Sequence, residues 1–386
     1  MLKLRIGNIL DRMDNNMTEW KECKISDIGT VVGGATPSTK NKKNYENGDI
    51  PWITPNDLST FYGRYIKCGE RNITKEGFDS CSTKLLPKNS VLFSSRAPIG
   101  YVAIAENEMC TNQGFKSVIP NKNIDSLFLY YLLKFNKDKI EGMGSGTTFK
   151  EISGNTMKNI KVCIPSDIKG QKKIAEILGN IDDKIEKNRE INNNLEQQAQ
   201  ALYHQMFITN RDPNWKNGVL SDLVIVRYGK DHKKLEDGIY PVYGSGGIMR
   251  YVEKSLYTGE SVLIPRKGTL NNVMYVNGAF WSVDTMFYTE MLHSNVAKFV
   301  YHFVKSKNLA SMNAGSAVPS MTTNILNAMQ LYIPDNETLS TFEEIVSPMY
   351  SQMQENKKQS KRLADVRDTL LPRLMSGEID ISGIEF

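Results

Sequence analysis

Apolar residues in two segments of the chain recur every three or four positions, as in a helix that buries one stripe. The first stripe runs through Ile174, Leu178, Ile181, Ile185, Leu195, Ala199, Leu202 and Met206, with polar Asn188 and Asn192 in its gaps. A second stripe, 168 residues later, runs through Phe342, Val346, Met349, Met353, Leu363, Leu370 and Leu374, with Asn356 and Ser360 in its gaps and Arg367 as one charged member. This alternation is a heptad seam and predicts two long helices.

The two predicted helices are natural partners, because either stripe alone would be exposed to water. If they pair antiparallel about a local twofold, facing positions sum to 548, which places Asn188 opposite Ser360 and Asn192 opposite Asn356. Such polar layers weaken a helix pair but fix its register. At 1.5 Å per residue the pair would be a spacer about 50 Å long. The alternative is that each helix packs separately on its own domain.

The segments that precede the two helices are duplicated too. Matching pairs, at offsets that shrink along the chain, are Trp20 with Trp215, Ser26–Asp27 with Ser221–Asp222, Tyr130 with Tyr301, and Ile164–Pro165 with Ile333–Pro334. A period this long means that each copy is a whole module with its own core. Two copies of one binding module imply a target in two parts.

Each module combines short strands with helices. β-Branched or aromatic runs at 91–93, 102–104, 262–264 and 273–275 predict strands, and residues 126–136 and 294–306 have helical spacing. The predicted fold class is α+β: a tandem duplication of two mixed modules separated by two long helices that form an antiparallel coiled coil with a pseudo-twofold. The predicted parts are an N-terminal extension (1–16), a first module (17–165), a central helical spacer (166–210), a second module (211–334), and a C-terminal helix with tail (335–386).

Charge is placed on the modules more than on the helices. The net charge is +5, yet residues 1–165 hold 23 Lys and Arg against 17 Asp and Glu, and residues 214–334 hold 12 against 8. This modest basic excess suits phosphate contacts. The five cysteines all lie in the first copy, so we expect reduced thiols that pack in the interior, and no disulfide or zinc framework. With neither a long apolar run nor a signal-peptide start, the sequence predicts a cytoplasmic protein.

Catalytic motifs are missing from the sequence. It contains neither Pro-Pro, which the amine-binding motif of a DNA amino-methyltransferase requires, nor a phosphate-binding Gly-x-x-x-x-Gly-Lys-Ser/Thr loop. The four histidines are not spaced as zinc ligands or catalytic bases. We therefore predict no catalytic residue, no metal site and no cofactor bound by this chain, which makes it a non-enzyme.

Polar, basic and aromatic residues in turns are the candidates for DNA contacts. In the first copy they are Thr36, Ser38, Lys40, Lys42, Lys43, Tyr45, Thr54, Asn56, Arg96 and Tyr101. In the second they are Lys230, His232, Lys233, Lys234, Tyr243, Ser245, Arg250, Arg266, Lys267, Asn271 and Asn272. Arg can bind guanine and Asn adenine, while Lys mainly meets phosphate. The alternative for any single member is a solvated loop side chain.

The two copies share their scaffold but differ in these loops. Residues 51–56 read Pro-Trp-Ile-Thr-Pro-Asn, whereas the corresponding residues 241–246 read Pro-Val-Tyr-Gly-Ser-Gly. Each module would then recognise a different short sequence. A spacer of about 50 Å corresponds to at most roughly 15 base pairs between the recognition centres.

The chain resembles the specificity subunits of type I restriction-modification systems over about residues 17–386. Besides the two modules and two helical repeats, the resemblance rests on five segments: 33–38 (Gly-Gly-Ala-Thr-Pro-Ser), 52–54 (Trp-Ile-Thr), 144–147 (Gly-Ser-Gly-Thr), Ile164–Pro165 with 171–175 (Gln-Lys-Lys-Ile-Ala), and 367–377 (Arg-Asp-Thr-Leu-Leu-Pro-Arg-Leu-Met-Ser-Gly). The second copy departs from the commoner pattern at 228–232 (Tyr-Gly-Lys-Asp-His). No individual base contact is therefore carried over from the family.

The resemblance implies a non-catalytic subunit whose two target-recognition domains bind a bipartite site in double-stranded DNA. It also implies two methyltransferase subunits that use S-adenosylmethionine, and two restriction subunits that use ATP and Mg²⁺. The outward faces of residues 171–208 and 339–376 would bind the methyltransferases. Two alternatives are a duplicated protein-interaction scaffold with incidental basic charge and a self-contained nuclease, which the missing motifs disfavour.

Overall fold

The computed structural model describes residues 19–96, 98–146, 150–312 and 320–381, so the predicted extension 1–16 lies outside the described residues. The chain divides into two compact units. The first unit contains residues 1–189 and 357–386, and the second contains residues 190–356. Both long helices, α8 (Ile168–His204) and α11 (Asn336–Met375), therefore contribute to both units.

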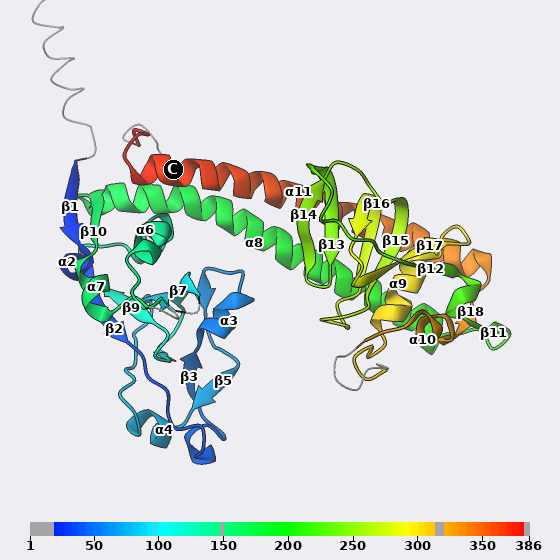
Figure 1. Cartoon of the computed structure of the whole chain (residues 1–386), viewed down its shortest axis with the longest axis horizontal. Coiled ribbons are helices and arrows are strands. Elements are labelled where there is room, and N and C mark those ends of the chain that lie inside the picture. The colour runs from blue at the N-terminus through cyan, green and yellow to red at the C-terminus, as the bar shows by residue number, and fades with distance from the viewer. Residues whose placement is uncertain (1–18, 97, 147–149, 313–319, 382–386) are drawn as a thin grey trace, which may run out of the picture. The chain divides into compact units, whose positions relative to one another are not determined.

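The first unit is built on three sheets (Figure 1). A five-stranded sheet has the order β2 (Gly29–Gly33), β9 (Lys116–Pro120), β6 (Val91–Ser95), β7 (Ile99–Ala105), β4 (Tyr65–Ile66). A three-stranded sheet has the order β5 (Arg71–Ile73), β3 (Ile50–Ile53), β8 (Cys110–Thr111), and a two-stranded sheet pairs β1 (Trp20–Lys24) antiparallel with β10 (Lys161–Pro165). The expected strands 91–93 and 102–104 fall in β6 and β7.

Short helices connect these strands, and one longer helix supports the five-stranded sheet. The short ones are α2 (Ile25–Ile28), the 3₁₀ turn η1 (Lys42–Asn44), α3 (Pro55–Ser59), α4 (Lys75–Asp79), α6 (Lys137–Gly142) and α7 (Gly154–Asn159). The longer helix, α5 (Ser126–Phe135), starts where the Asp125 side chain accepts a hydrogen bond from the Phe128 amide. Its apolar residues pack with β6, β7 and the first turns of α8 in one core.

The second unit contains a six-stranded sheet in the order β12 (Val224–Tyr228), β17 (Met286–Met291), β15 (Tyr257–Pro265), β16 (Met274–Ser282), β13 (Asp237–Gly244), β14 (Gly247–Val252). A two-stranded sheet pairs β11 (Lys216–Val219) antiparallel with β18 (Gln330–Ile333), as β1 pairs with β10 in the first unit. The turn η3 (Leu220–Asp222) and the helices α9 (Ala297–Lys305) and α10 (Thr323–Asn327) complete this unit. The expected strands 262–264 and 273–275 fall in β15 and β16, and the expected helix 294–306 is α9.

The helices pair antiparallel in each unit, as the seam predicts. In the first unit, Asn188 Nδ2 donates to Ser360 Oγ over 3.2 Å and to Gln359 Oε1 over 2.8 Å. In the second, Asn356 Nδ2 donates to Asn192 Oδ1 over 2.9 Å. Both pairs obey the predicted sum of 548, so the register prediction is confirmed.

The one charged seam position has a specific partner. Arg367 Nη1 binds the carboxylate of Asp182 at 2.6 Å, and Tyr131 donates a second hydrogen bond to the same carboxylate at 2.7 Å. Asp182 is buried, and a buried carboxylate needs such partners. The break in the stripe is therefore an ion pair across the helix pair of the first unit.

The five cysteines, Cys23, Cys68, Cys81, Cys110 and Cys163, form no disulfide bond. All are free thiols, as expected. Cys110 is buried, but Cys68 and Cys163 are exposed, so the expectation that the thiols pack in the interior is wrong for these two. Within the described residues, no helix is both long and apolar enough to cross a membrane. The fold class is thus a tandem α+β duplication whose two long helices form an antiparallel coiled coil.

Candidate nucleic-acid interface

Loops of the first unit converge around Thr36. Trp52 Nε1 donates to the Ala35 carbonyl over 3.1 Å, and the Thr36 hydroxyl donates to the Gln113 side chain. Gly34 approaches the Thr111 and Asn112 carbonyls so closely that a Cβ there would meet them at 2.2 Å. These contacts bring the predicted segments 36–45 and 54–56 next to a turn at 112–114 that sequence reasoning did not select.

Lysines cluster on η1 and the turn before it. Lys40, Lys42 and Lys43 are exposed, and Tyr45 holds the segment in place because its hydroxyl donates to the Pro37 carbonyl over 2.6 Å. The Tyr45 ring also packs edge-on against Trp52, with centroids 5.9 Å apart. A hollow of about 550 Å³ lies beside it, lined by residues that include Lys42, Tyr45, Arg71 and Asn72. This cluster can supply phosphate contacts beside a pocket with polar edges.

Three of the residues predicted to contact DNA in the first unit use their side chains in contacts within the protein. Thr54 caps α3, because its hydroxyl accepts a hydrogen bond from the Asp57 amide over 3.4 Å while its own amide donates to the Asp57 carboxylate over 2.7 Å. Arg96 is ion-paired with Glu151, which Lys116 also binds. Tyr101 packs against the core cluster of Phe115 and its neighbours.

The other two predicted residues of the first unit have more exposed side chains. Ser38 and Asn56 are exposed, and each is anchored through its backbone carbonyl, which accepts a bond from Asn44 or Ser59. Their side chains face solvent and are available for DNA.

In the second unit, the basic loop 230–234 is tied to the sheet through its backbone. Trp281 Nε1 donates to the Lys230 carbonyl over 2.8 Å, and the Lys230 amide donates to the Ser282 carbonyl over 2.8 Å. The side chains of Lys230, Lys233 and Lys234 are exposed, while His232 is half-buried. The loop thus presents three cations from a fixed backbone.

The turn between β13 and β14 meets the loop 266–272. Asn272 Nδ2 donates to the Ser245 carbonyl over 2.7 Å, and a Cβ at Gly268 would contact Ser245 Oγ at 2.7 Å. Arg266 donates to the Asp284 carbonyl over 3.2 Å and lies 5.6 Å from the Tyr228 ring centroid. Tyr228, which sequence reasoning missed, is half exposed beside that cation.

The remaining predicted residues of the second unit support these loops. Arg250 donates to the Leu235 carbonyl and pairs with Asp237 at 2.7 Å. Asn271 joins its loop to residues 308–310, because it donates to Asn308 and accepts from the Ala310 amide. Burial raises the pKa of Tyr243, so this hydroxyl stays neutral. Lys267 is exposed.

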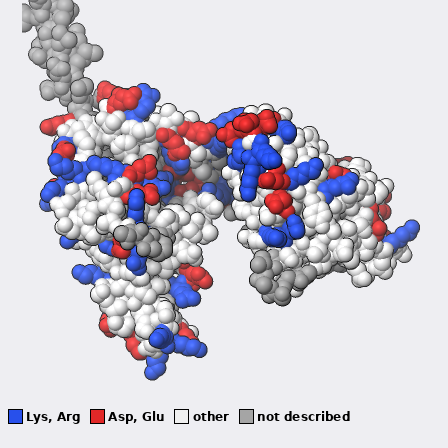
Figure 2. Space-filling view, viewed as in Figure 1, with Lys and Arg blue, Asp and Glu red and all other residues white. Residues whose placement is uncertain are grey.

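On the face shown in Figure 2, Lys and Arg side chains of both units alternate with Asp and Glu side chains. Their basic excess is small, so non-specific attraction to DNA would be moderate. Recognition would then depend on where the fixed loops place a few cations, amides and hydroxyls. Gln113 and Arg71 belong with those candidates, and the polar turn Asn112–Gln113–Gly114 was the available sequence signal for the first.

Buried cations attach each globular part to its helix. Arg64, only 4% exposed, reaches from the start of β4 to the α8 residues Asp183 and Glu186. In the second unit, Lys298 of α9 binds Glu260 of β15 at 2.9 Å and Glu343 of α11. These contacts fix the loops relative to the helix segments of the same unit.

Comparison with known proteins places this fold among DNA specificity proteins. Residues 17–197 and 213–364 match the family described as type I restriction modification DNA specificity domain. The chain is 31% identical to the type I restriction enzyme MjaIX specificity subunit of Methanocaldococcus jannaschii, over 94% of each chain. It is 25% identical to the EcoprrI specificity subunit of Escherichia coli, over 84% of this chain and 86% of the other. The crystal structure of a type I S subunit from M. genitalium has a similar fold, with a TM-score of 0.60 at 18% identity over 93% of this chain and 97% of the other.

Proposed function

The chain belongs to the family of type I restriction-modification specificity subunits, and from that premise we propose that each of its two units reads one half of a bipartite DNA site. The family gives the chain a role in DNA sequence specificity. The division of labour between the units is our inference. One observation carries it: two units with the same scaffold present different loops.

The loops of the two units present different hydrogen-bonding and charged groups. The first unit offers the Thr36 loop, the lysines of η1 and the Gln113 turn, whereas the second offers the loop 230–234 and the paired segments around Ser245 and Arg266. Hydrogen-bonding groups at different places select different base edges. Two unlike half-sites follow.

The partners proposed for this chain are two methyltransferase subunits and two restriction subunits. The exposed faces of 171–208 and 339–376 are the proposed methyltransferase surface. S-adenosylmethionine would be bound by the methyltransferase, and ATP and Mg²⁺ by the restriction subunit, so this chain supplies recognition only. A protein-interaction scaffold is the competing function, and DNA affinity separates the two.

The three lysines of η1 and the turn before it provide the test. Affinity of the chain with its methyltransferase for target DNA should fall steeply with salt, because each neutralised phosphate releases counterions. Replacing Lys40, Lys42 and Lys43 by Gln should reduce the slope of log K against log salt by about 3, since each phosphate that a lysine neutralises adds about 0.9 to that slope. Fluorescence anisotropy at several salt concentrations measures this slope.

The matched control replaces three exposed lysines outside the candidate loops and outside the proposed methyltransferase surface, Lys122, Lys158 and Lys169, by Gln. It should leave the slope within experimental error of the wild type. DNA affinity that is absent, or independent of salt, would favour the scaffold. With labelled S-adenosylmethionine the chain alone should methylate no DNA, and methylation should require the added methyltransferase.

A further inference from the structure

A hollow of about 700 Å³ opens in the second unit where α8 ends, within the range of roughly 300–1,000 Å³ typical of ligand pockets. Its lining shares no residue with the predicted DNA-contacting set. The floor is aromatic. Tyr203 lies in the last turn of α8, Phe207 lies in the π-helical turn η2 (Gln205–Thr209) that follows it, and Phe299 and Phe303 come from α9. Each of these four rings is at most 4% exposed.

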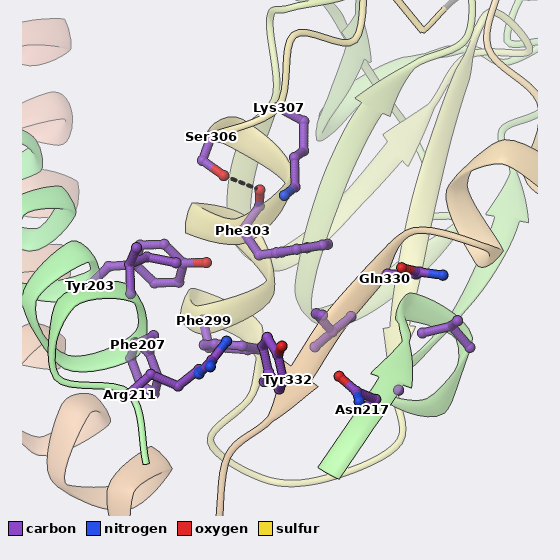
Figure 3. A pocket seen from close by; sticks show the side chains of 14 residues that line it. Tyr203, Phe207, Arg211, Asn217, Phe299, Phe303, Ser306, Lys307, Gln330 and Tyr332 are labelled. Atoms are coloured by element: carbon purple, nitrogen blue, oxygen red, sulfur yellow. Dashed lines mark hydrogen bonds between the residues drawn. The ribbon is translucent and has the colours of Figure 1, made fainter. Parts of the chain in front are cut away.

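The rim is both apolar and cationic (Figure 3). Ile208 is 55% exposed and Tyr332 is 38% exposed. The Arg211 guanidinium lies 3.6 Å from the Tyr332 ring centroid, and Lys307 Nζ lies 4.5 Å from that of Phe303. Among the described residues that line the hollow, none is Asp or Glu. The hollow therefore favours an anion joined to an apolar group.

The arrangement of the cations narrows the chemistry further. A guanidinium stacked on a ring keeps its in-plane N–H groups free, and these match the two oxygens of a carboxylate. The cations cover the Tyr332 and Phe303 ring faces, so a nucleobase would find little stacking surface there. A DNA backbone would gain nothing from the aromatic floor. Aspartate or glutamate beside a large apolar side chain satisfies both parts of the hollow.

Among the described residues, the corresponding place in the first unit is built differently. Asn217 and Gln330 of the hollow correspond, at offsets of 195 and 169, to Glu22 and Lys161. In the first unit these two form an ion pair at 2.8 Å, and Lys139 donates to the Lys161 carbonyl over 2.6 Å. Lys307 corresponds to Asn136, so one of the two rim cations is also missing. A partner that uses the hollow would therefore bind once per chain, unlike one that uses the duplicated helices.

We propose that this hollow binds an acidic segment with a large apolar residue, supplied by a protein partner of the restriction-modification complex and bound once per chain. The inference rests on the proposed function, because it assumes that partner subunits assemble on this chain. The apolar side chain would lie above the aromatic floor, in contact with Ile208 and Tyr332 of the rim, while Arg211 and Lys307 bind the carboxylate.

Charge reversal tests the proposal in the assembled complex. The variant Arg211→Glu with Lys307→Glu should bind one partner subunit about tenfold more weakly, since it places like charges against the segment. Native mass spectrometry of the chain with its methyltransferase and restriction subunits should show one copy of that subunit lost. The control, Lys139→Glu with Lys161→Glu, reverses two charges at the corresponding place of the first unit and should assemble normally.

Four results would overturn the proposal. In the first two, the charge-reversal variant assembles with the composition and affinity of the wild type, or it binds DNA more weakly with a smaller salt slope, which would make the hollow a DNA contact. In the third, the variant loses a second copy of this chain from the assembly, which would make the hollow a contact between two copies. In the fourth, the control variant loses the partner subunit to the same extent. If the wild-type chain assembles with neither subunit, the proposed function itself fails. If it assembles and the variant matches it, only this inference fails.

A photocrosslinker keeps the proposal testable should the variant misfold. Benzoylphenylalanine at Ile208 should crosslink, in the purified complex, to a partner peptide within a few residues of an Asp or Glu. The same probe at Ile225, an exposed apolar residue of the second unit outside the hollow, should not capture that peptide. Equal crosslinking at both positions, or crosslinking only to DNA, contradicts the proposal.

Discussion

At the scale of single residues, the predicted DNA-contacting side chains fall into two groups. Some end in solvent, such as Lys42 and Asn56, and can meet DNA directly. Others, such as Thr54 and Arg250, spend their hydrogen bonds on the protein and hold the loops in place. For Thr54 this supporting role could have been predicted from the sequence, because Thr54 and Asp57 have the spacing of a capping box. The supporting role of Arg250 could not be predicted, because its partner, Asp237, is brought near it only by the strand pairing.

One buried residue makes stability depend on pH. His302 lies between Gln200, 2.7 Å from Nδ1, and Tyr350, 2.9 Å from Nε2. Burial, together with the charge of Lys305, lowers the pKa of His302 to about 4. The unfolded chain has the ordinary histidine pKa of about 6.5, so between these values only the unfolded state takes up the proton.

This histidine should therefore stabilise the fold fully above pH 6.5. We predict a loss of up to about 3 kcal/mol in the free energy of unfolding as pH falls from 6.5 to 4. Urea unfolding of the wild type and of His302→Gln at several pH values measures the effect, because the difference between the two curves isolates this residue. A difference that stays constant over that range would show that His302 titrates alike in both states.

At the scale of secondary-structure elements, period and register were predictable while long-range partners were not. The heptad pattern located both helices and the 548 sum paired their polar layers, because these features depend only on spacing. The ion-pairing role of Asp182 was not predicted, because its partner, Arg367, lies on the other helix. The buried ion pairs of Arg64 and Lys298 were not predicted for the same reason, because their partners are far away in sequence.

The polar layer of the second unit gives a prediction about this helix pair. Asn192 Nδ2 also donates to the Met353 carbonyl over 3.1 Å, so the layer is well satisfied. Replacing Asn192 and Asn356 together by Leu should raise the stability by about 1–4 kcal/mol, yet relax the preference for one spacer length. Urea unfolding and methylation of targets with altered spacers measure the two effects. Unchanged stability and unchanged spacer preference would contradict the assigned role of the layer.

The single change Asn192→Leu serves as the comparison for that pair. It leaves the Asn356 amide without its cross-helix acceptor, so it should destabilise the chain by about 1–3 kcal/mol. Stabilisation by the single change as well would mean that the two amides do not act as a pair.

At the scale of the whole molecule, the duplication and the unlike loops were visible in the sequence, and they led to a reader of two half-sites. The grouping of the loops was visible only in part. Thr36 and Gln113, or Ser245 and Asn272, meet through strand pairings that no local pattern encodes. The hollow beside α8 was missed entirely, because its lining comes from α8, η2, α9, β11 and β18 together. Sequence reasoning therefore identified the class of site better than its members.

The most direct test of the central claim, that each unit reads its own half-site, is a map of methylated adenines in cells that carry this chain with its methyltransferase. Residues 36–56 would be exchanged for the corresponding loop of a related specificity subunit. The account predicts a split recognition motif in which the exchange changes one half and leaves the other half and the spacer unchanged. A change in both halves, or a motif that is not split, would contradict it.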